Sequence, residues 1–165
     1  MIRCVVLIVA LTLVSNASSL HAAPDYTQCV LESIYSSGGQ RGTTVQVEFS
    51  GVNSGLQGAH DLLIDGPAGI TVKKVEPADG GRIKATLEIA ADAALGRRMI
   101  RVHGGKTGLT NFRWFFVGDF PEHVEKERNN TPEQAEEVKL PIVINGRLAQ
   151  TLDQDVFRFQ VEAGQ

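Results

Sequence analysis

Residues 109–117 read Leu-Thr-Asn-Phe-Arg-Trp-Phe-Phe-Val, the densest strand-like run of the chain. Side chains alternate between the two faces of a β-strand, so Phe112, Trp114 and Phe116 share one face. Phe115 then lies on the opposite face. We expect Trp114 to be the largest side chain of the core. On that interpretation, replacing Trp114 with alanine costs about 3–5 kcal/mol of stability.

Six shorter runs of the same kind precede residue 109 and indicate an antiparallel β-sandwich. Val45, Val47 and Phe49, for example, alternate with polar residues, as in a half-buried strand. The expected strands cover residues 28–34, 45–49, 62–64, 70–75, 83–89, 100–102 and 109–117. Turn residues separate them at a spacing typical of sandwich folds, and no helical pattern interrupts them. The fold class is therefore all-β, with an immunoglobulin-like β-sandwich over residues 24–120.

The first 22 residues have the pattern of a secretory signal peptide. Arg3 supplies a positive charge, residues 4–14 are apolar, and residues 15–22 are mostly small or polar. The apolar part is too short for a spanning helix of about 20 residues. We expect cleavage after Ala22, although Ser15-x-Ala17 also fits the small-x-small pattern. We expect no membrane span afterwards, and a secreted, cell-surface or periplasmic location. Cleavage leaves Cys29 as the one thiol, which we expect to be a small buried apolar group.

Charge is distributed unevenly along the chain. The formal net charge is −3; residues 24–121 carry ten basic and ten acidic side chains, whereas residues 122–165 carry five basic and nine acidic ones. Neither part has the basic surface that nucleic-acid binding requires, so we expect no nucleic-acid partner. The acidity of residues 122–165 suits cation binding or solubility alone.

Motifs that would indicate catalysis are absent from the sequence. It has no Gly-x-Ser-x-Gly nucleophile elbow. His60, His103 and His123 are widely separated and lack zinc-ligand spacing, so we expect them on the surface. Five basic residues could form a patch for acidic glycans, although solvated positions on separate strands are the simpler expectation. These residues are Lys73, Lys74, Arg97, Arg98 and Arg101. The sequence therefore predicts no enzymatic activity.

Residues 125–131, Glu-Lys-Glu-Arg-Asn-Asn-Thr, contain two carboxylates, two amides and no apolar side chain. Such a stretch is either a solvated linker or a source of hard oxygen ligands for a metal ion. The residues alone leave both readings open. We assign residues 121–131 to an acidic linker between two modules.

Beyond this linker, residues 132–165 predict the truncated start of a second module. Residues 131–134, Thr-Pro-Glu-Gln, have a capping-box pattern, so we expect a short helix through Glu137. Residues 142–144 and 155–161 follow as strands. The roughly forty residues from 122 to 165, with two strands, bury too little apolar surface to form a core alone. We therefore expect an incomplete, jelly-roll-like second β-sandwich.

Three stretches in the first part of the chain resemble a known module. They are Gly-Gly-Gln-Arg-Gly-Thr-Thr-Val at 38–45, Ala-Ala-Asp-Ala-Ala-Leu-Gly at 90–96 and Phe-Val-Gly at 116–118. Together they resemble the N-terminal β-sandwich of large secreted proteins of planctomycete-like bacteria. That β-sandwich is related to the IPT/TIG immunoglobulin-like modules.

The last part of the chain is similar to the start of a bacterial pre-peptidase C-terminal domain. The similarity rests on Glu-x-Glu-x-Asn-Asn-Thr from residue 125, Leu-Pro-Ile-Val-Ile-Asn-Gly at 140–146 and Asp-x-Asp-Val-Phe-Arg-Phe at 153–159. Members of that family are non-catalytic β-sandwiches, and some bind calcium. The resemblance implies calcium ligands at Glu125, Glu127, Asn129, Asn130, Asp153 and Asp155. Calcium takes six to eight oxygen ligands from such carboxylates, amides and carbonyls.

Two functions follow as expectations. The first is a non-catalytic exported β-sandwich module, the N-terminal part of a secreted or cell-surface protein, serving adhesion, spacing or substrate attachment. Its partners would be an extracellular protein or a polysaccharide. The alternative is the accessory N-terminal region of a secreted hydrolase, a peptidase, whose catalytic domain lies beyond residue 165.

Overall fold

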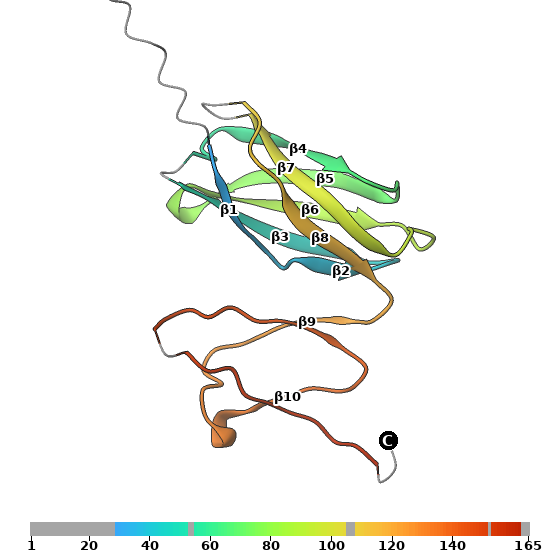
Figure 1. Ribbon diagram of the computed structural model, residues 1–165, viewed down its shortest axis with the longest axis vertical. Coiled ribbons are helices and arrows are strands. Elements are labelled where there is room, and N and C mark those ends of the chain that lie inside the picture. Colours follow the sequence, from blue (N-terminus) through green and yellow to red (C-terminus); the bar gives the residue numbers. More distant parts are fainter. Residues whose placement is uncertain (1–28, 53–54, 105–107, 152, 163–165) are drawn as a thin grey trace, which may run out of the picture.

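The fold is all-β, as the sequence predicts (Figure 1). A computed structural model describes residues 29–52, 55–104, 108–151 and 153–162. The signal peptide expected over residues 1–22 lies outside these ranges. Two four-stranded sheets are followed by two two-stranded ones. Within the described ranges, no helix has the length and apolar character needed to cross a membrane.

The first sheet is antiparallel throughout and has β5 and β1 at its edges. In spatial order it consists of β1 (Leu31–Tyr35), β3 (Thr44–Gly51), β6 (Arg82–Ile89) and β5 (Ile70–Ala78). We expected the strand from residue 70 to end at residue 75, but β5 continues through Pro77 and the chain turns at Asp79–Gly81. An edge strand tolerates proline because the missing N–H faces away from its neighbour.

The second sheet packs against the first and contains a strand that the sequence did not reveal. In spatial order it consists of β2 (Gly38–Gln40), β8 (Arg113–Gly118), β7 (Gly96–Gly104) and β4 (Ala59–Asp65). Strand β2 runs parallel to β8, where we expected only a loop. A Cβ atom on Gly39 would lie 2.4 Å from Ile89 Cδ1 and 3.3 Å from Phe115 Cζ. The absence of a side chain at Gly39 therefore lets β2 pack closely against the core.

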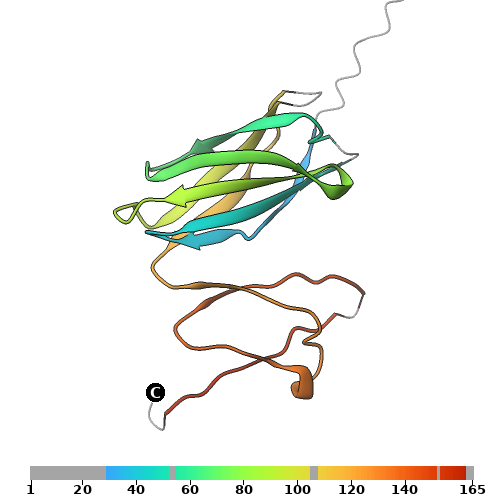
Figure 2. The ribbon, with the colours of Figure 1, turned by 180° about the vertical axis from the view of Figure 1, so that it is seen from behind.

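The core lies between these two sheets, which form the two layers seen from opposite sides in Figures 1 and 2. Alternation along the strands supplies it: on β6, Ile83, Ala85, Leu87 and Ile89 are buried while the residues between them are more exposed. Cys29 is buried in the same cluster, as predicted. Each large apolar side chain buried in this way contributes about 1.5–3 kcal/mol.

The predicted role of Trp114 in the core is wrong. Trp114 is 39% exposed, whereas Phe115 is fully buried and Val117 nearly so. The alternation correctly predicted which residues share each face of β8, but it does not show which face points into the core. The register with β7 decides this, because Phe115 pairs with the buried Arg98 and Trp114 pairs with the outward-facing Met99.

Arg98 is also placed differently from the expectation that it faces solvent. Its side chain is 1% exposed, and its guanidinium donates to backbone carbonyl oxygens in two neighbouring turns. Nη2 donates to Ala94 O at 2.7 Å and to Ala68 O at 3.4 Å, and Nη1 donates to Arg97 O at 3.2 Å. A buried cation without such acceptors would be costly. Arg98 thus joins the turn before β7 to the turn between β4 and β5.

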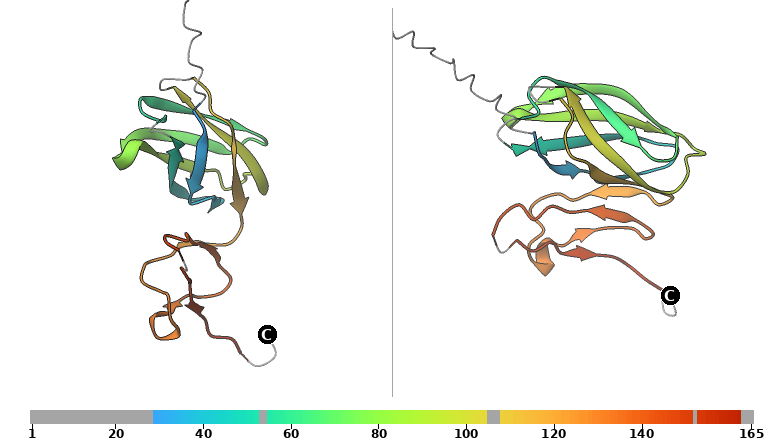
Figure 3. Two further views of the ribbon diagram at one scale, coloured as in Figure 1. Left: turned by 60° about the vertical axis from the view of Figure 1, so that its left-hand side comes forward. Right: turned by 45° about the horizontal axis from the view of Figure 1, so that its top comes forward.

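The remaining described residues form a smaller tail next to one edge of the sandwich (Figure 3). Its strands are β9 (Glu122–Val124), β10 (Glu136–Glu137), β11 (Val143–Asn145) and β12 (Phe157–Arg158). They pair in parallel, β11 with β9 and β10 with β12. The expected helix through Glu137 is a single 3-10 turn at Pro132–Gln134, and Thr131 makes no side-chain capping bond. Strand β9 lies inside the range that we assigned to the linker.

Candidate metal centre

The tail meets the sandwich at a seam built around Asn145. Tyr35 Oη donates to the Asn145 carbonyl oxygen at 3.2 Å, and the Ser37 backbone N–H donates to Asn145 Oδ1 at 3.1 Å. Asn145 Nδ2 donates to Glu122 Oε2 at 2.5 Å. The same carbonyl oxygen accepts the backbone N–H of Glu125 at 3.1 Å. Pairing of β9 with β11 thereby fixes the start of the acidic stretch against the sandwich.

Three carboxylates converge just beyond this seam. Glu125, Glu127 and Asp155 each offer an oxygen atom, and these atoms lie within 4.8 Å of one another. We call these three residues the acidic cluster. Backbone bonds bring Asp155 there, because the N–H of its neighbour Val156 donates to Asn129 O at 2.8 Å. Among the described residues, none of the three forms an ion pair with lysine or arginine.

Several oxygen atoms of the same stretches are buried and unused. Asn129 is fully buried, yet neither its Oδ1 nor its Nδ2 has a hydrogen-bond partner among the described residues. The other buried oxygen atoms without a partner in this part of the structure are Glu125 Oε2, Asn130 Oδ1, Asp153 Oδ1 and Asp155 Oδ1. Buried polar atoms are nearly always hydrogen-bonded, so this concentration calls for an explanation.

The electrostatics of the acidic cluster are unfavourable when no cation is present. Burial raises the pKa of the Glu125 carboxyl, and the charges of Asp155 and Glu127 raise it further. A hydrogen bond from the Arg147 backbone N–H opposes this rise. Burial and the Glu125 charge also raise the pKa of the Tyr35 hydroxyl. Repulsion from its two neighbours thus adds to the effect of burial on Glu125, while Glu127 itself is exposed to solvent.

Arg147 links the acidic cluster to the sandwich, a role that no sequence pattern predicted. Its backbone N–H donates to Glu125 Oε1. Its guanidinium lies over the Tyr35 ring, 4.0 Å from the ring centre, and Nη2 is 3.3 Å from Glu48 Oε1. At this position the chain has only an Asn-Gly-Arg sequence after a short apolar run, which does not indicate these contacts.

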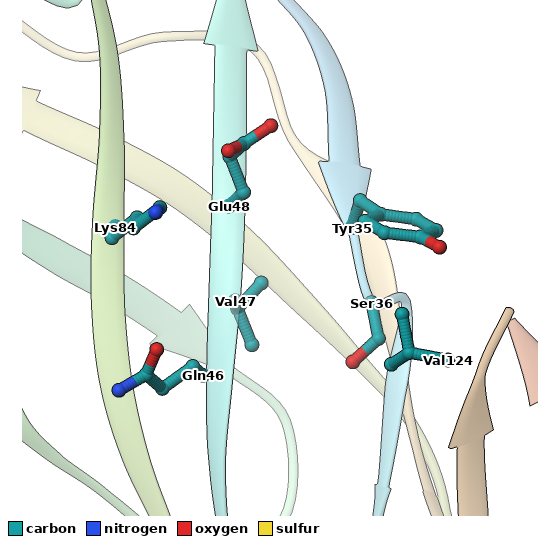
Figure 4. A pocket seen from close by; sticks show the side chains of 7 residues that line it. All are labelled: Tyr35, Ser36, Gln46, Val47, Glu48, Lys84 and Val124. Atoms are coloured by element: carbon teal, nitrogen blue, oxygen red, sulfur yellow. The ribbon is translucent and has the colours of Figure 1, made fainter. Parts of the chain in front are cut away.

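An open hollow of about 300 Å³ lies beside this link, between the first sheet and the tail. Figure 4 shows Glu48 and Gln46 on one strand, with Lys84 on one side and Tyr35 on the other. Val124 of β9 closes it from the tail. Its lining combines acidic, basic and aromatic side chains, so the hollow does not by itself define a ligand.

The structure brings together some of the predicted metal ligands and not others. Glu125, Glu127 and Asp155 form the acidic cluster. Asp153 lies outside it, although the resemblance implied that it is a ligand; its Oδ2 accepts the Ala149 N–H at 2.5 Å. The side chains of Asn129 and Asn130 contribute unpartnered oxygen atoms on the adjoining stretch.

These residues fit a hard cation. The donors are all oxygen atoms, which suits calcium or magnesium and excludes the sulfur and imidazole ligands of typical zinc sites. Irregular backbone around the three carboxylates favours calcium, because magnesium demands near-ideal octahedral geometry. Gly146 leaves the space open, since a Cβ there would lie 3.2 Å from Glu125 Oε2 and 3.5 Å from Asp155 Oδ2.

The histidines are widely separated in sequence, but two of them meet in the fold. His60 and His103 lie on the surface as predicted, but their rings meet edge to face with centres 5.7 Å apart. His123 Nε2 is 2.9 Å from Glu136 Oε1 in the tail. The antiparallel pairing of β4 with β7 produces the first contact, and sequence spacing could not reveal it.

Comparisons of the chain with known protein families and with curated proteins gave no match. The function proposed below therefore rests on the sequence, the fold and the candidate metal centre.

Proposed function

We propose that the chain is a non-catalytic exported β-sandwich module of a secreted or cell-surface protein, serving adhesion, spacing or substrate attachment, and that calcium stabilises its joint. The observation that carries the calcium part is the acidic cluster with its unpartnered buried oxygen atoms. A divalent cation would give Glu125, Glu127 and Asp155 a common partner and remove their mutual repulsion.

Export and the non-catalytic role rest on the sequence. Residues 1–22 have the charge and apolar pattern of a signal peptide, and the chain lacks a nucleophile elbow. The resemblance to secreted IPT/TIG and pre-peptidase C-terminal modules supports the same conclusion. N-terminal sequencing of protein recovered from the periplasm or the medium should begin near Ala23.

The calcium site would act on the position of the tail. Glu125 is tied to Arg147 and through it to Tyr35 and Glu48 of the sandwich, whereas Asp155 belongs to the far end of the tail. An ion held by both carboxylates would connect the two ends of the tail and hold them against the seam. Such a module would transmit force or keep a fixed spacing in an extracellular protein.

Thermal unfolding in calcium tests this proposal. A ligand that binds only the folded state adds about 2.7 kcal/mol at a hundredfold excess over its dissociation constant. Millimolar calcium should therefore raise the melting temperature of the chain, while magnesium does little. Glu127→Gln and Asp155→Asn should each remove most of the increase. Glu133→Gln, an exposed glutamate outside the acidic cluster, is the matched control and should keep it. An unchanged melt with no heat in a calcium titration would leave this stretch as a solvated linker.

A further inference from the structure

The outer face of the second sheet carries a line of exposed aromatic side chains. Phe112, Trp114 and Phe116 alternate along β8 and the residue before it, and they are 37%, 39% and 48% exposed. The Phe112 and Trp114 rings meet edge to face with centres 5.1 Å apart. Residues 112 and 116 are about 13 Å apart along an extended strand. A contiguous patch of exposed apolar side chains, unlike single exposed ones, is a mark of an interaction site.

Two arginines of β7 lie over these rings. The Arg97 guanidinium is 4.9 Å from the Trp114 ring centre, and that of Arg101 is 5.8 Å from the Phe112 ring centre. Arg101 is neutralised by an ion pair with Asp65. Arg97 has no carboxylate partner within the described part of the chain. A guanidinium stacked on a ring keeps its N–H edges free for bidentate contact with an anion.

The face is open, and its backbone is already paired. Strand β8 bonds to β2 on one side and to β7 on the other, so it offers no free edge to a peptide. In Figure 1, β7 and β8 cross the near side of the sandwich, and the tail lies beneath them. A peptide that binds by adding a strand needs a free sheet edge, and β8 offers none. A ligand of this face would contact its side chains.

We propose that this aromatic–arginine face, made of Phe112, Trp114, Phe116, Arg97 and Arg101, binds an extended polysaccharide that carries carboxylate groups. Sugar rings present apolar C–H faces to aromatic side chains, and uronate carboxylates match the unpaired charge of Arg97. The length of the aromatic line suits several consecutive sugar units. This inference deepens the attachment role proposed above by naming its surface and ligand class, and it does not depend on calcium.

Binding of the chain to polygalacturonate, with dextran as the uncharged polymer, tests the inference. Affinity electrophoresis and calorimetry should detect binding to polygalacturonate and much weaker binding to dextran. Arg97→Gln and Trp114→Ala should each weaken binding about tenfold or more, because each removes a charge-assisted bond or a stacking surface. Lys84→Gln on the opposite sheet and Leu148→Ala in the tail are matched controls and should bind normally. Melting curves would show that each variant remains folded.

The outcomes separate this inference from the calcium proposal. Polymer binding that persists in EDTA and in Glu127→Gln supports the face even if calcium has no effect. Calcium stabilisation without polymer binding would refute the proposal that the aromatic–arginine face binds polysaccharide, and would leave the calcium proposal standing. Equal binding of dextran, or binding unchanged in both face variants, would also refute the polysaccharide proposal. Trp114-dependent self-association in place of polymer binding would identify the face as a protein interface instead.

Discussion

The sandwich and the tail are stabilised by different means. Sixteen described apolar side chains form the buried cluster between the two large sheets. In the described part of the tail the buried residues are two apolar ones, Ala135 and Val138, and two amides, Asn129 and Asn145. Large apolar tail residues remain exposed, including Leu148 at 75% and Val161 at 59%. The sandwich depends on apolar burial, whereas the tail depends on polar contacts with its neighbour.

Separating the two regions should produce the largest effect. A chain that ends at Phe120 should keep a cooperative melt and β-type circular dichroism, because its buried cluster is complete. Residues 122–165 alone should show no cooperative melt, because two-stranded sheets without a core are marginal in water. Losing the Tyr35 and Ser37 bonds to Asn145 should lower the melting temperature of the shortened sandwich by only several degrees. If the shortened sandwich fails to melt cooperatively, the seam is part of its core and the comparison is wrong.

The next-largest effect should be the difference in stability between substitutions on the two faces of β8. Phe115→Ala should destabilise the chain by about 3–5 kcal/mol, because it opens a cavity in the buried cluster. Trp114→Ala should cost less than about 1 kcal/mol, since its ring is half exposed on the outer face. Urea unfolding of both variants measures the difference directly. Comparable losses would mean that the outer face contributes to folding as much as the inner one.

Alternation of side chains predicted the sandwich because each strand carries its own signal. The alternation from Ile83 to Ile89 predicts a half-buried strand without any information about the neighbouring strands. Gly38–Gln40 has no such signal, so the register with β8 alone makes it a strand. The prediction that Trp114 points into the core failed for a related reason. An alternating run shows which residues share a face, but the partner strand decides which face points inward.

The acidic cluster was predictable in part. Glu125 and Glu127 are near in sequence, and the resemblance to calcium-binding modules added Asp155. Arg147 could not be found in this way, because its contacts with Tyr35 and Glu48 join positions about a hundred residues apart. Composition indicates which residues could bind a cation, but tertiary packing decides which of them meet.

The smallest expected effect concerns Glu122 at the seam. Burial raises the pKa of its carboxyl, although the hydrogen bond from Asn145 opposes this. The folded state therefore binds more protons than the unfolded state between the two pKa values, and stability falls as pH rises through that range. At neutral pH the ionised carboxylate still carries this cost, so Glu122→Gln, which keeps the acceptor for Asn145, should raise the melting temperature by a few degrees at most. The gain should disappear below about pH 4, where the wild-type carboxyl is also neutral. Glu32→Gln, on an exposed position of β1, reports the effect of the same exchange away from the seam. An equal gain for Glu122→Gln at neutral pH and below about pH 4 would show that the buried ionised carboxylate is not the cause of the gain.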